Sequence, residues 1–498
     1  MLPEFDETYR VLLLSSEVAP FAKTGGLADV AGSLPKALAM LGNDVRVVLP
    51  RYRGIQGLRT LGDFPVWVNG RRETAILRQS FIRAHLSNVE RTVPVYFIDN
   101  YHYFDRDGLY GYADDAERFA FFSRAALEAA RFLGFTPSIV HGNDWQTGPA
   151  LLLLKTAYAK DPVVGRSAGV FTIHNLQYQG NFDRSALGIL GVDETHFHPD
   201  GVEFYGQVSY MKAGINYADV VNTVSNTYAQ EIQTPACGHG MDGVLRRRSR
   251  DLFGIVNGLN YHEFNPATDP RIYRQYDADH LDAKAVNKHE LQKEMGLPVA
   301  DVPLAGMVAR LVSQKGLDLL LGVADQLPSL RLQLVVLGTG DPHYEEALRR
   351  LQQQLPGQVA VAIGFNTVLA QRIYAGSDLF LMPSQFEPCG LGQLLALRYG
   401  TIPVVRATGG LKDTVADYDA ALGTGTGFVF QEYTPNALLS TLRRALELYE
   451  RRDAWNRMVR QAMAADFSWN RSAVEYMGLY AAARAKAGQT GAARAATA

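Results

Sequence analysis

Residues 11–30, which read VLLLSSEVAPFAKTGGLADV, join an apolar run to a glycine-containing loop and then to an apolar, helix-like segment. The four apolar residues 11–14 predict a buried parallel strand, because such strands are covered on both faces. A helix that begins after the loop leaves backbone N–H groups unpaired, and its dipole favours an anion beside them. Gly25 and Gly26 allow a close approach of the main chain, and Lys23 adds a full positive charge. The stretch therefore predicts an α/β protein with an anion site in this loop.

The same loop has a plainer interpretation as a turn, because glycine pairs are common between strands and helices. It lacks the G-x-G-x-x-G pattern of dinucleotide-binding loops, and it is longer than their tight turn. It does not have the pattern of a P-loop either. The remainder of the chain has to decide between a turn and an anion site.

Length and composition indicate an ordinary soluble globular protein. The chain has 498 residues, too many for one hydrophobic core, so we expect two domains of about 200–250 residues each. Apolar residues make up 47% and charged residues 20%, which are common values. The formal net charge of −2 gives no general attraction for nucleic acid or an anionic membrane. We therefore expect neither partner, and an anionic ligand must be bound locally.

Cysteine usage and hydropathy favour a cytoplasmic location. The chain has two cysteines, Cys237 and Cys389, which excludes a disulfide framework and fits a reducing compartment. The first ten residues, MLPEFDETYR, lack the basic start and the apolar run of a signal peptide. No run approaches about 18 uninterrupted apolar residues, so we expect no membrane-spanning helix.

Two successive series of strand-like segments divide the chain. Parallel neighbours need crossovers of about a dozen residues or more, so each series predicts a parallel sheet with helices between its strands. The first series comprises 11–14, 45–49, 92–98, 138–140, 169–173, 218–224 and 253–256, with antiparallel strands expected between 60 and 90. The second series comprises 304–308, 332–337, 359–363, 379–382, 402–405 and 427–430.

The two series define the expected domains. Residues 1–260 form a first parallel-sheet domain, and residues 261–466, which begin with a charged, proline-punctuated linker, form a second. A final helix is expected over 467–485. Residues 486–498, KAGQTGAARAATA, contain few bulky apolar side chains, so we expect a disordered tail there.

Polar residues gather after the strands of the first series. The cluster HGNDW at 141–145, the residues from His174 onward, and Asn257 each come directly after a predicted strand. Open parallel sheets bind their ligands at the carboxyl ends of the strands. We therefore expect these side chains to lie at a binding edge. Residues 181–210 break the strand–helix rhythm and are expected to be an insertion at the rim.

Basic residues and glycines also follow strands of the second series. Arg310 and Lys315 lie on a strand-to-helix loop. The planar guanidinium of arginine and the flexible ammonium of lysine both suit a diphosphate, although cationic side chains on loops are often simply solvated. Residues 383–393, PSQFEPCGLGQ, open a helix whose first amides, those of Leu391 and Gly392, could bind an anion.

A carboxylate, Glu387, stands beside this expected phosphate site. A negative charge there needs a reason, and hydrogen bonding to sugar hydroxyls or stabilisation of a developing cation would supply one. A further glycine pair lies at 408–411 after the next strand. Two domains that both present glycine loops and cations at strand ends suggest a ligand held in a cleft between two sheets.

Six motifs occur in one order along residues 10–480: K-T-G-G-L-A-D at 23–29, H-x-x-D-W at 141–145, T-I-H-N-L-x-Y-Q-G at 172–180, R-L-x-S-Q-K-G at 310–316, F-E-P-C-G-L at 386–391 and T-G-G-L-x-D-T-V at 408–415. The ordered set resembles bacterial glycogen synthases and the related plant starch synthases. The resemblance implies the α/β fold called GT-B, in which two Rossmann-like parallel-sheet domains face each other across a deep cleft, with the final helix returning to the first domain. It also implies retaining transfer of glucose from ADP-glucose to the non-reducing end of glycogen or a linear α-1,4-glucan.

The resemblance also implies roles for residues of the first domain. Lys23 would contact the donor phosphates, and His174 would lie near the glucose. Asp29, Asp144 and Asn257 would line the active-site cleft. Residues 1–260 would therefore form the acceptor side, or starch synthase catalytic domain.

The second domain, on the donor side, would be similar to group 1 glycosyltransferases. Arg310 and Lys315 would bind the diphosphate, and Glu387 would be the donor-site carboxylate. The resemblance thus gives as catalytic residues Glu387, His174, Arg310 and Lys315, and it adds to the substrate site Cys389, Gly390, Leu391 and Gly392. Two positions depart from the family pattern, which usually has Thr in place of Gly392 and often Asp in place of Asn260.

Retention of configuration leaves two routes open. Glu387 could be a covalent nucleophile, as in retaining glycosidases, or the acceptor could attack from the front face within an ion pair. We favour front-face attack, because Glu387 is as well suited to binding sugar hydroxyls. Closure of two cationic lobes on the diphosphate would exclude water. Four loop tyrosines could stack on the glucan, although aromatics more often pack into cores; they are Tyr101, Tyr103, Tyr110 and Tyr112.

No cofactor or metal is expected, because cations and amides can neutralise the leaving diphosphate. Two D-x-D pairs lie in charged stretches that are typical of solvated surfaces; they are Asp277/Asp279 and Asp417/Asp419. His196 and His198 have no third ligand nearby in the sequence, which favours a solvated loop over a metal site.

Other functions remain open from the sequence. The best alternative is another nucleotide-sugar-dependent GT-B glycosyltransferase, with UDP-glucose as donor or a disaccharide as product. A phosphorylase would need a lysine-bound pyridoxal phosphate. A catalytically silent glucan-binding protein would have gaps among the cleft residues, and the sequence has none.

Overall fold

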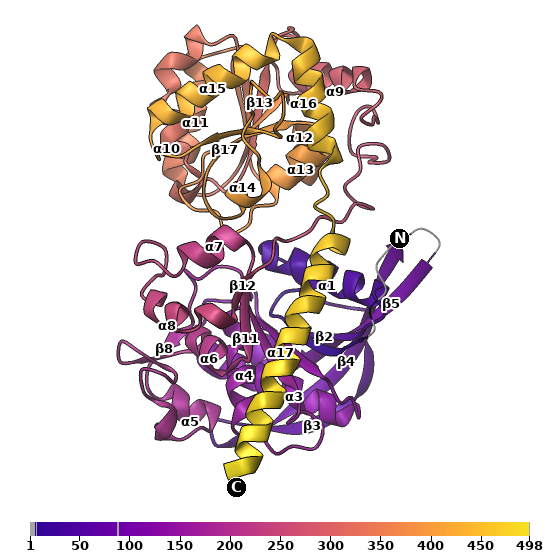
Figure 1. The fold of residues 1–498 in the computed structure, drawn as a ribbon, viewed down its shortest axis with the longest axis vertical. Helices are drawn as coiled ribbons and strands as arrows, with labels where there is room; N and C mark the ends of the chain where they lie inside the picture. Colours follow the sequence, from indigo (N-terminus) through magenta and orange to yellow (C-terminus); the bar gives the residue numbers. More distant parts are fainter. Residues whose placement is uncertain (1–4, 6, 87–88, 498) are drawn as a thin grey trace. The chain divides into compact units, whose positions relative to one another are not determined.

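The structure is a computed structural model, in which residue 5 and residues 7–86 and 89–497 are described. The chain folds as two compact units. Unit 1 consists of Met1–Gly258 and Trp469–Ala498, and unit 2 consists of Leu259–Ser468 (Figure 1). Within the described ranges, no helix is long and apolar enough to cross a membrane.

Unit 1 is built around a mainly parallel sheet. In spatial order its strands are β12 (Leu252–Gly254), β11 (Val220–Thr223), β7 (Ala168–Ile173), β6 (Ile139–Asn143), β1 (Arg10–Leu14), β2 (Asp44–Pro50), β5 (Val89–Asp99), β4 (Arg71–Leu86) and β3 (Arg59–Val68). Neighbours from β12 to β5 pair in parallel. The antiparallel pairing of β3, β4 and β5 confirms the antiparallel strands predicted between 60 and 90.

Helices cover this sheet, and residues 11–14 are at most 1% exposed, as expected for a strand covered on both faces. The α-helices are α1 (Gly26–Met40), α2 (Tyr101–Phe104), α3 (Asp115–Phe132), α4 (Gly148–Lys155), α5 (Ala186–Leu190), α6 (Tyr210–Tyr217), α7 (Asn226–Glu231) and α8 (Asp242–Arg247). Short 3-10 turns lie at η1 (Trp145–Thr147), η2 (Glu194–His196) and η3 (Ser249–Asp251). The predicted insertion contains a small antiparallel sheet in the order β8 (Asn181–Phe182), β10 (Gln207–Ser209) and β9 (Glu203–Phe204).

Strand β6 is longer than predicted, because it continues through Asn143 instead of ending at residue 140. His141 therefore lies inside the sheet and is fully buried. Its Nε2 is 2.6 Å from Thr172 Oγ1, and its Nδ1 is 3.0 Å from the Tyr480 hydroxyl. Since both ring nitrogens have hydrogen-bond partners, the polar side chain does not end the strand.

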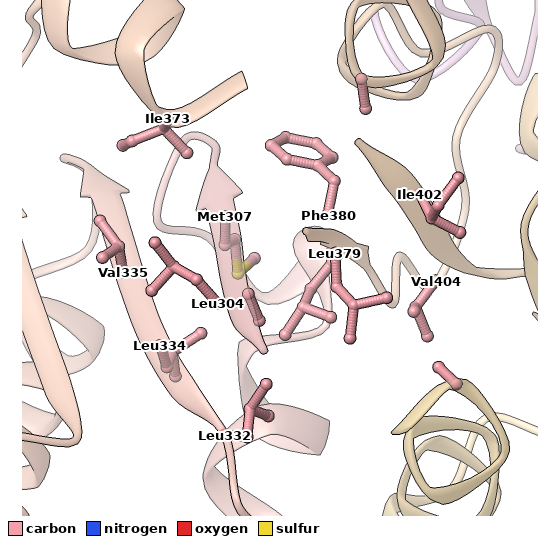
Figure 2. Close-up of a cluster of buried hydrophobic side chains, with 14 of the residues drawn as sticks. Leu304, Met307, Leu332, Leu334, Val335, Ile373, Leu379, Phe380, Ile402 and Val404 are labelled. Carbon is pink, nitrogen blue, oxygen red and sulfur yellow. The ribbon is translucent and has the colours of Figure 1, made fainter. Parts of the chain in front are cut away.

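Unit 2 contains a parallel sheet in the order β15 (Val359–Ile363), β14 (Gln333–Gly338), β13 (Leu304–Val308), β16 (Leu379–Met382), β17 (Ile402–Arg406) and β18 (Phe428–Phe430). The bounds of β13, β15 and β16 are those predicted. Figure 2 shows apolar side chains of neighbouring strands packed together, among them Leu304, Leu334 and Leu379. The helices of this unit are α9 (Asp282–Glu294), α10 (Leu317–Gly322), α11 (Pro342–Gln354), α12 (Thr367–Gly376), α13 (Gly392–Arg398), α14 (Gly409–Thr414), α15 (Pro435–Tyr449) and α16 (Arg452–Ala464), with 3-10 turns η4 (Ser313–Lys315) and η5 (Ala324–Ser329).

The final helix, α17, runs over Trp469–Thr497 and belongs to unit 1, where it packs against α1 and β7 (Figure 1). The helix continues through residues 486–497, where the sequence analysis expects a disordered tail, and Ala498 lies outside the described residues. Alanine, the strongest helix former, is frequent in this segment. Lys486 also forms an ion pair with Asp251.

A directed chain of buried hydrogen bonds joins α17 to the sheet. Asn222 donates to the Tyr476 hydroxyl, and the Thr172 hydroxyl donates to Asn222 Oδ1. Thr172 Oγ1 therefore accepts from His141 Nε2, which leaves His141 Nδ1 to accept from the Tyr480 hydroxyl. This series of hydrogen bonds is complete only while α17 is docked, because Tyr476 and Tyr480 of α17 are the partners at its two ends.

Tyr480→Phe should lower the free energy of unfolding of unit 1 by about 1–3 kcal/mol, because a buried acceptor on His141 would lose its only donor. Calorimetry measures the change as a lower Tm. Tyr9→Phe is the matched control, since the Tyr9 hydroxyl donates to Glu7 near the surface and its loss should cost less than about 0.5 kcal/mol. Equal effects of the two variants would contradict the role of the Tyr480 hydroxyl.

Candidate active site

His174 and Asp144, both predicted site residues, meet at the carboxyl ends of β7 and β6. The backbone N–H of His174 donates to Asp144 Oδ1 over 2.7 Å. His174 Nε2 lies 2.9 Å from Asn143 Oδ1, and Asn143 Nδ2 donates to the Leu14 carbonyl over 3.0 Å. These bonds tie together the ends of β1, β6 and β7.

The His174 ring is a neutral imidazole with a defined proton position. Because Asn143 directs its amide nitrogen to Leu14, its Oδ1 is the acceptor for His174, so Nε2 carries the proton. Burial lowers the pKa of His174 to about 3, which keeps the ring uncharged at pH 7. Nδ1 therefore offers a lone pair that can accept a hydrogen bond, for example from a sugar hydroxyl.

Asp144 combines backbone strain with an unusual titration. Its φ of 56° and ψ of 177° lie in a region that residues other than glycine rarely adopt. Burial raises the pKa of Asp144 to about 7, the N–H groups of His174 and Asn175 oppose this rise, and the negative charge of Glu17 adds to it. The carboxyl group therefore changes charge near neutral pH.

The loop before α1 presents Lys23 toward solvent. Lys23 Nζ lies 2.6 Å from Asp29 Oδ1, and the two side chains are 51% and 36% exposed. A Cβ added at Gly25 or Gly26 would meet no atom within 4 Å, so internal packing requires neither glycine. The sequence predicts a ligand in this open space.

Two backbone N–H groups of this loop are not free to bind a ligand anion, although the sequence analysis predicts an anion site there. The Thr24 and Gly25 N–H groups donate to Glu17 Oε2 over 2.5 and 3.3 Å, so a side chain of the protein already occupies them. Sequence reasoning missed Glu17. Its signal was a lone carboxylate three residues after the apolar strand at 11–14.

Asn257 follows β12 and is only 6% exposed. Its Oδ1 has no hydrogen-bond partner among the described residues. A buried carbonyl oxygen without a donor is costly, and a ligand hydroxyl would satisfy it.

In unit 2, the predicted residues Lys315 and Glu387 form a shielded ion pair. Lys315 Nζ lies 2.6 Å from Glu387 Oε2, and their side chains are 16% and 8% exposed. The Ser384 hydroxyl donates to the same oxygen over 3.1 Å. Arg310 is exposed and forms no ion pair with another described residue. A cation and a carboxylate are thus fixed side by side after two neighbouring strands, β13 and β16.

The glycines of the second motif allow close approaches of the backbone. A Cβ on Gly410 would lie 2.1 Å from the Cys389 carbonyl oxygen, and the Gly410 N–H donates to the Glu387 carbonyl over 3.1 Å. Gly390 has a φ of +75°, which favours glycine. A Cβ on Gly392, which follows Leu391, would lie 3.0 Å from the Phe380 ring, so a larger residue would need local rearrangement.

The metal candidates are engaged in local contacts. Asp277 pairs with His280, Asp417 pairs with Arg444, and His196 Nδ1 lies 2.6 Å from the Tyr217 hydroxyl. Among the residues that the structure describes, no group of three or more His, Cys, Asp or Glu side chains could hold a metal ion.

The four loop tyrosines do not form one stacking surface. Tyr101 is 80% exposed, whereas Tyr103 is fully buried. The Tyr110 hydroxyl donates to Glu17, and the Tyr112 ring lies under the guanidinium of Arg106. Three of these rings are thus committed to internal contacts.

Sequence reasoning also missed Phe365, which follows the carboxyl end of β15. Its side chain is 87% exposed, unusual for a phenylalanine. The sequence signal was a single aromatic residue in the polar segment GFNT directly after a predicted strand.

Asp144→Asn should stabilise unit 1 increasingly as the pH rises from about 4 to about 7. In that window the unfolded chain releases the Asp144 proton while the folded chain keeps it, so wild-type stability falls with pH. Asparagine cannot ionise, and the difference should level off above pH 7. Urea unfolding across this range measures it. Asp183→Asn is the control, because Ser185 lowers the pKa of that exposed carboxylate; a pH-independent effect of Asp144→Asn would contradict the shift.

Comparisons with known proteins agree with this geometry. Residues 10–247 match the family described as the starch synthase catalytic domain, and residues 289–462 match group 1 glycosyl transferases. Glycogen synthase of Desulforudis audaxviator is 59% identical over 96% of this chain and 97% of that protein, and the Thermotoga maritima enzyme is 48% identical over 96% and 100%.

Solved structures give the same result. The catalytic domain of Starch Synthase IV from Arabidopsis thaliana, bound to ADP and acarbose, has a TM-score of 0.87 at 36% identity and covers 96% of this chain and 100% of its own. Sucrose-phosphate synthase from Thermosynechococcus elongatus shares the fold at a TM-score of 0.57 and 20% identity, covering 95% and 98%. These matches confirm the predicted fold class and the motif resemblance: the chain belongs to the family of glycogen and starch synthases and is a glucosyl-transferring glycosyltransferase.

Proposed function

We propose that this chain transfers glucose from ADP-glucose to the non-reducing end of glycogen or another α-1,4-glucan, with retention of configuration and in the cytoplasm. A nucleotide-sugar donor and a glucan acceptor follow from the relatives named glycogen synthase. The observation that carries the proposal is the shielded Lys315–Glu387 pair, which puts a cation for a diphosphate beside a carboxylate for a sugar.

Charge on the leaving diphosphate is the main electrostatic problem of the reaction. Lys315 and Arg310 in unit 2, with Lys23 in unit 1, would neutralise it. Donors placed where charge develops contribute much of catalysis, and the loss of one costs about 3–4 kcal/mol. The unprotonated Nδ1 of His174 would accept a hydrogen bond from a sugar hydroxyl.

Glu387 fits front-face attack better than a covalent route. One of its oxygens already accepts hydrogen bonds from Lys315 and Ser384, which lowers its power as a nucleophile and leaves the other oxygen for sugar hydroxyls. Rescue of Glu387→Ala by azide with an inverted product would instead support a covalent intermediate.

Phe365 favours an adenine nucleotide. An exposed ring at a strand carboxyl end offers a stacking surface, and a purine covers more of it than a pyrimidine does. We therefore propose ADP-glucose over UDP-glucose as the donor.

Donor choice tests the function directly. Labelled ADP-glucose with glycogen should give labelled polymer, faster than UDP-glucose does, and EDTA should not stop it because no metal is proposed. Phe365→Ala should raise KM for ADP-glucose about tenfold, since base stacking contributes about 1–3 kcal/mol. Transfer to a small sugar but not to glycogen would support the alternative, a disaccharide-forming transferase.

A double-mutant cycle tests the ion pair. Lys315→Met and Glu387→Gln should each lower kcat about 100-fold or more, and the double variant should lose less than the product of the two effects, because partners of one pair are not additive. Lys155→Met and Asp219→Asn form the control cycle, since that pair is also 2.6 Å apart but lies outside the proposed site, and its kcat should stay unchanged. Fully additive losses at Lys315 and Glu387 would contradict their coupling.

A further inference from the structure

Glu17 lies at the centre of the loop that carries Lys23, and it is 3% exposed. Four donors converge on its carboxylate. Oε2 accepts the N–H groups of Thr24 and Gly25 at 2.5 and 3.3 Å, while Oε1 accepts the hydroxyls of Thr24 at 2.6 Å and Tyr110 at 2.8 Å. With its lone pairs engaged in this way, Glu17 is poorly placed to act as a general base.

The carboxylate is also anchored from behind. Because the Tyr110 hydroxyl donates to Glu17, its oxygen can accept from the Ser16 hydroxyl, 2.8 Å away. The Ser15 hydroxyl donates to the Glu17 carbonyl over 2.6 Å and fixes the main chain of the same residue. Glu17 is therefore a rigid support, and the loop is the element that it shapes.

This arrangement changes how the loop can meet a phosphate. The Thr24 and Gly25 amides already bind an anion that belongs to the protein. A phosphate at the same amides would have to displace a buried carboxylate or approach it closely, and like charges repel strongly where water is excluded. The exposed ammonium of Lys23, the residue before Thr24, stays accessible.

We propose that Glu17 is a positioning residue for glucosyl transfer: it replaces a ligand anion at the Thr24 and Gly25 amides and so fixes the loop from which Lys23 reaches the donor diphosphate. The inference rests on the proposed function, since it assigns the loop's partner as the diphosphate of a nucleotide sugar. Glu17 itself touches neither sugar nor phosphate. Its charge also reaches the site electrostatically, because it contributes to the raised pKa of Asp144.

Glu17→Gln is the first test, because the side chain keeps its size but its amide nitrogen cannot accept from the loop N–H groups. We expect kcat to fall about 10- to 100-fold, as for loss of charged hydrogen bonds, and KM for ADP-glucose to rise while KM for glycogen stays unchanged. Thr24→Val removes one donor to Glu17, and its kcat should fall about three- to tenfold. Thr24→Ser keeps that donor and should restore nearly all activity.

Glu128→Gln is the matched control. Glu128 also accepts from a tyrosine hydroxyl, that of Tyr158, in the same unit but away from this loop, so its kcat should stay within about twofold of wild type. Hydrogen exchange of peptides spanning residues 20–28 gives a readout without catalysis. Exchange should be about tenfold faster in Glu17→Gln than in wild type, and unchanged in Glu128→Gln.

A folded Glu17→Gln variant with wild-type kcat and KM would overturn the proposal. If that variant does not fold, Thr24→Val decides in its place, and wild-type kinetics there would overturn it equally. If wild-type protein transfers glucose from no nucleotide sugar, the proposed function fails. Faster exchange at residues 20–28 in Thr24→Val or Glu17→Gln would still support the role of Glu17 in holding the loop, and unchanged exchange would overturn it.

Discussion

In both units, candidate site residues include carboxylates that are shielded from water near the carboxyl ends of parallel strands. A shielded carboxylate is costly unless donors surround it. Glu17 has two amides and two hydroxyls, Asp144 has backbone amides, and Glu387 has a lysine and a serine. Each set of donors comes from a neighbouring loop, so satisfying the carboxylate also fixes the loop.

The two units meet this constraint in different ways. In unit 1 the donors to Glu17 are neutral amides and hydroxyls. Burial raises the pKa of Asp144, and the carboxylate of Glu17 adds to that rise. In unit 2 Lys315 neutralises Glu387 directly. Under the proposed function, a diphosphate bound at Lys315 would compete with Glu387 for the same ammonium group.

Local patterns were sufficient for the framework. Runs of apolar residues gave the bounds of β13, β15 and β16 correctly, because a strand covered on both faces has a signature within its own few residues. The predictions were wrong where contacts with residues far away in the sequence determine the local structure. His141 continues β6 only because Thr172 and Tyr480 satisfy its ring. Likewise, the role of Glu17 depends on its contacts with the Thr24 and Gly25 amides and with the distant Tyr110 hydroxyl, which the sequence pattern does not show.

The docking of α17 in unit 1 affects biosynthesis. The ribosome makes residues 259–468 before it makes the helix that completes the first unit. During translation, His141 and the apolar surface around it therefore stay exposed until α17 is made, while the intervening unit can already fold. Such transiently exposed surface is where nascent chains aggregate or recruit chaperones. The late synthesis of one helix thus leaves unit 1 incomplete until residues 259–468 have been made.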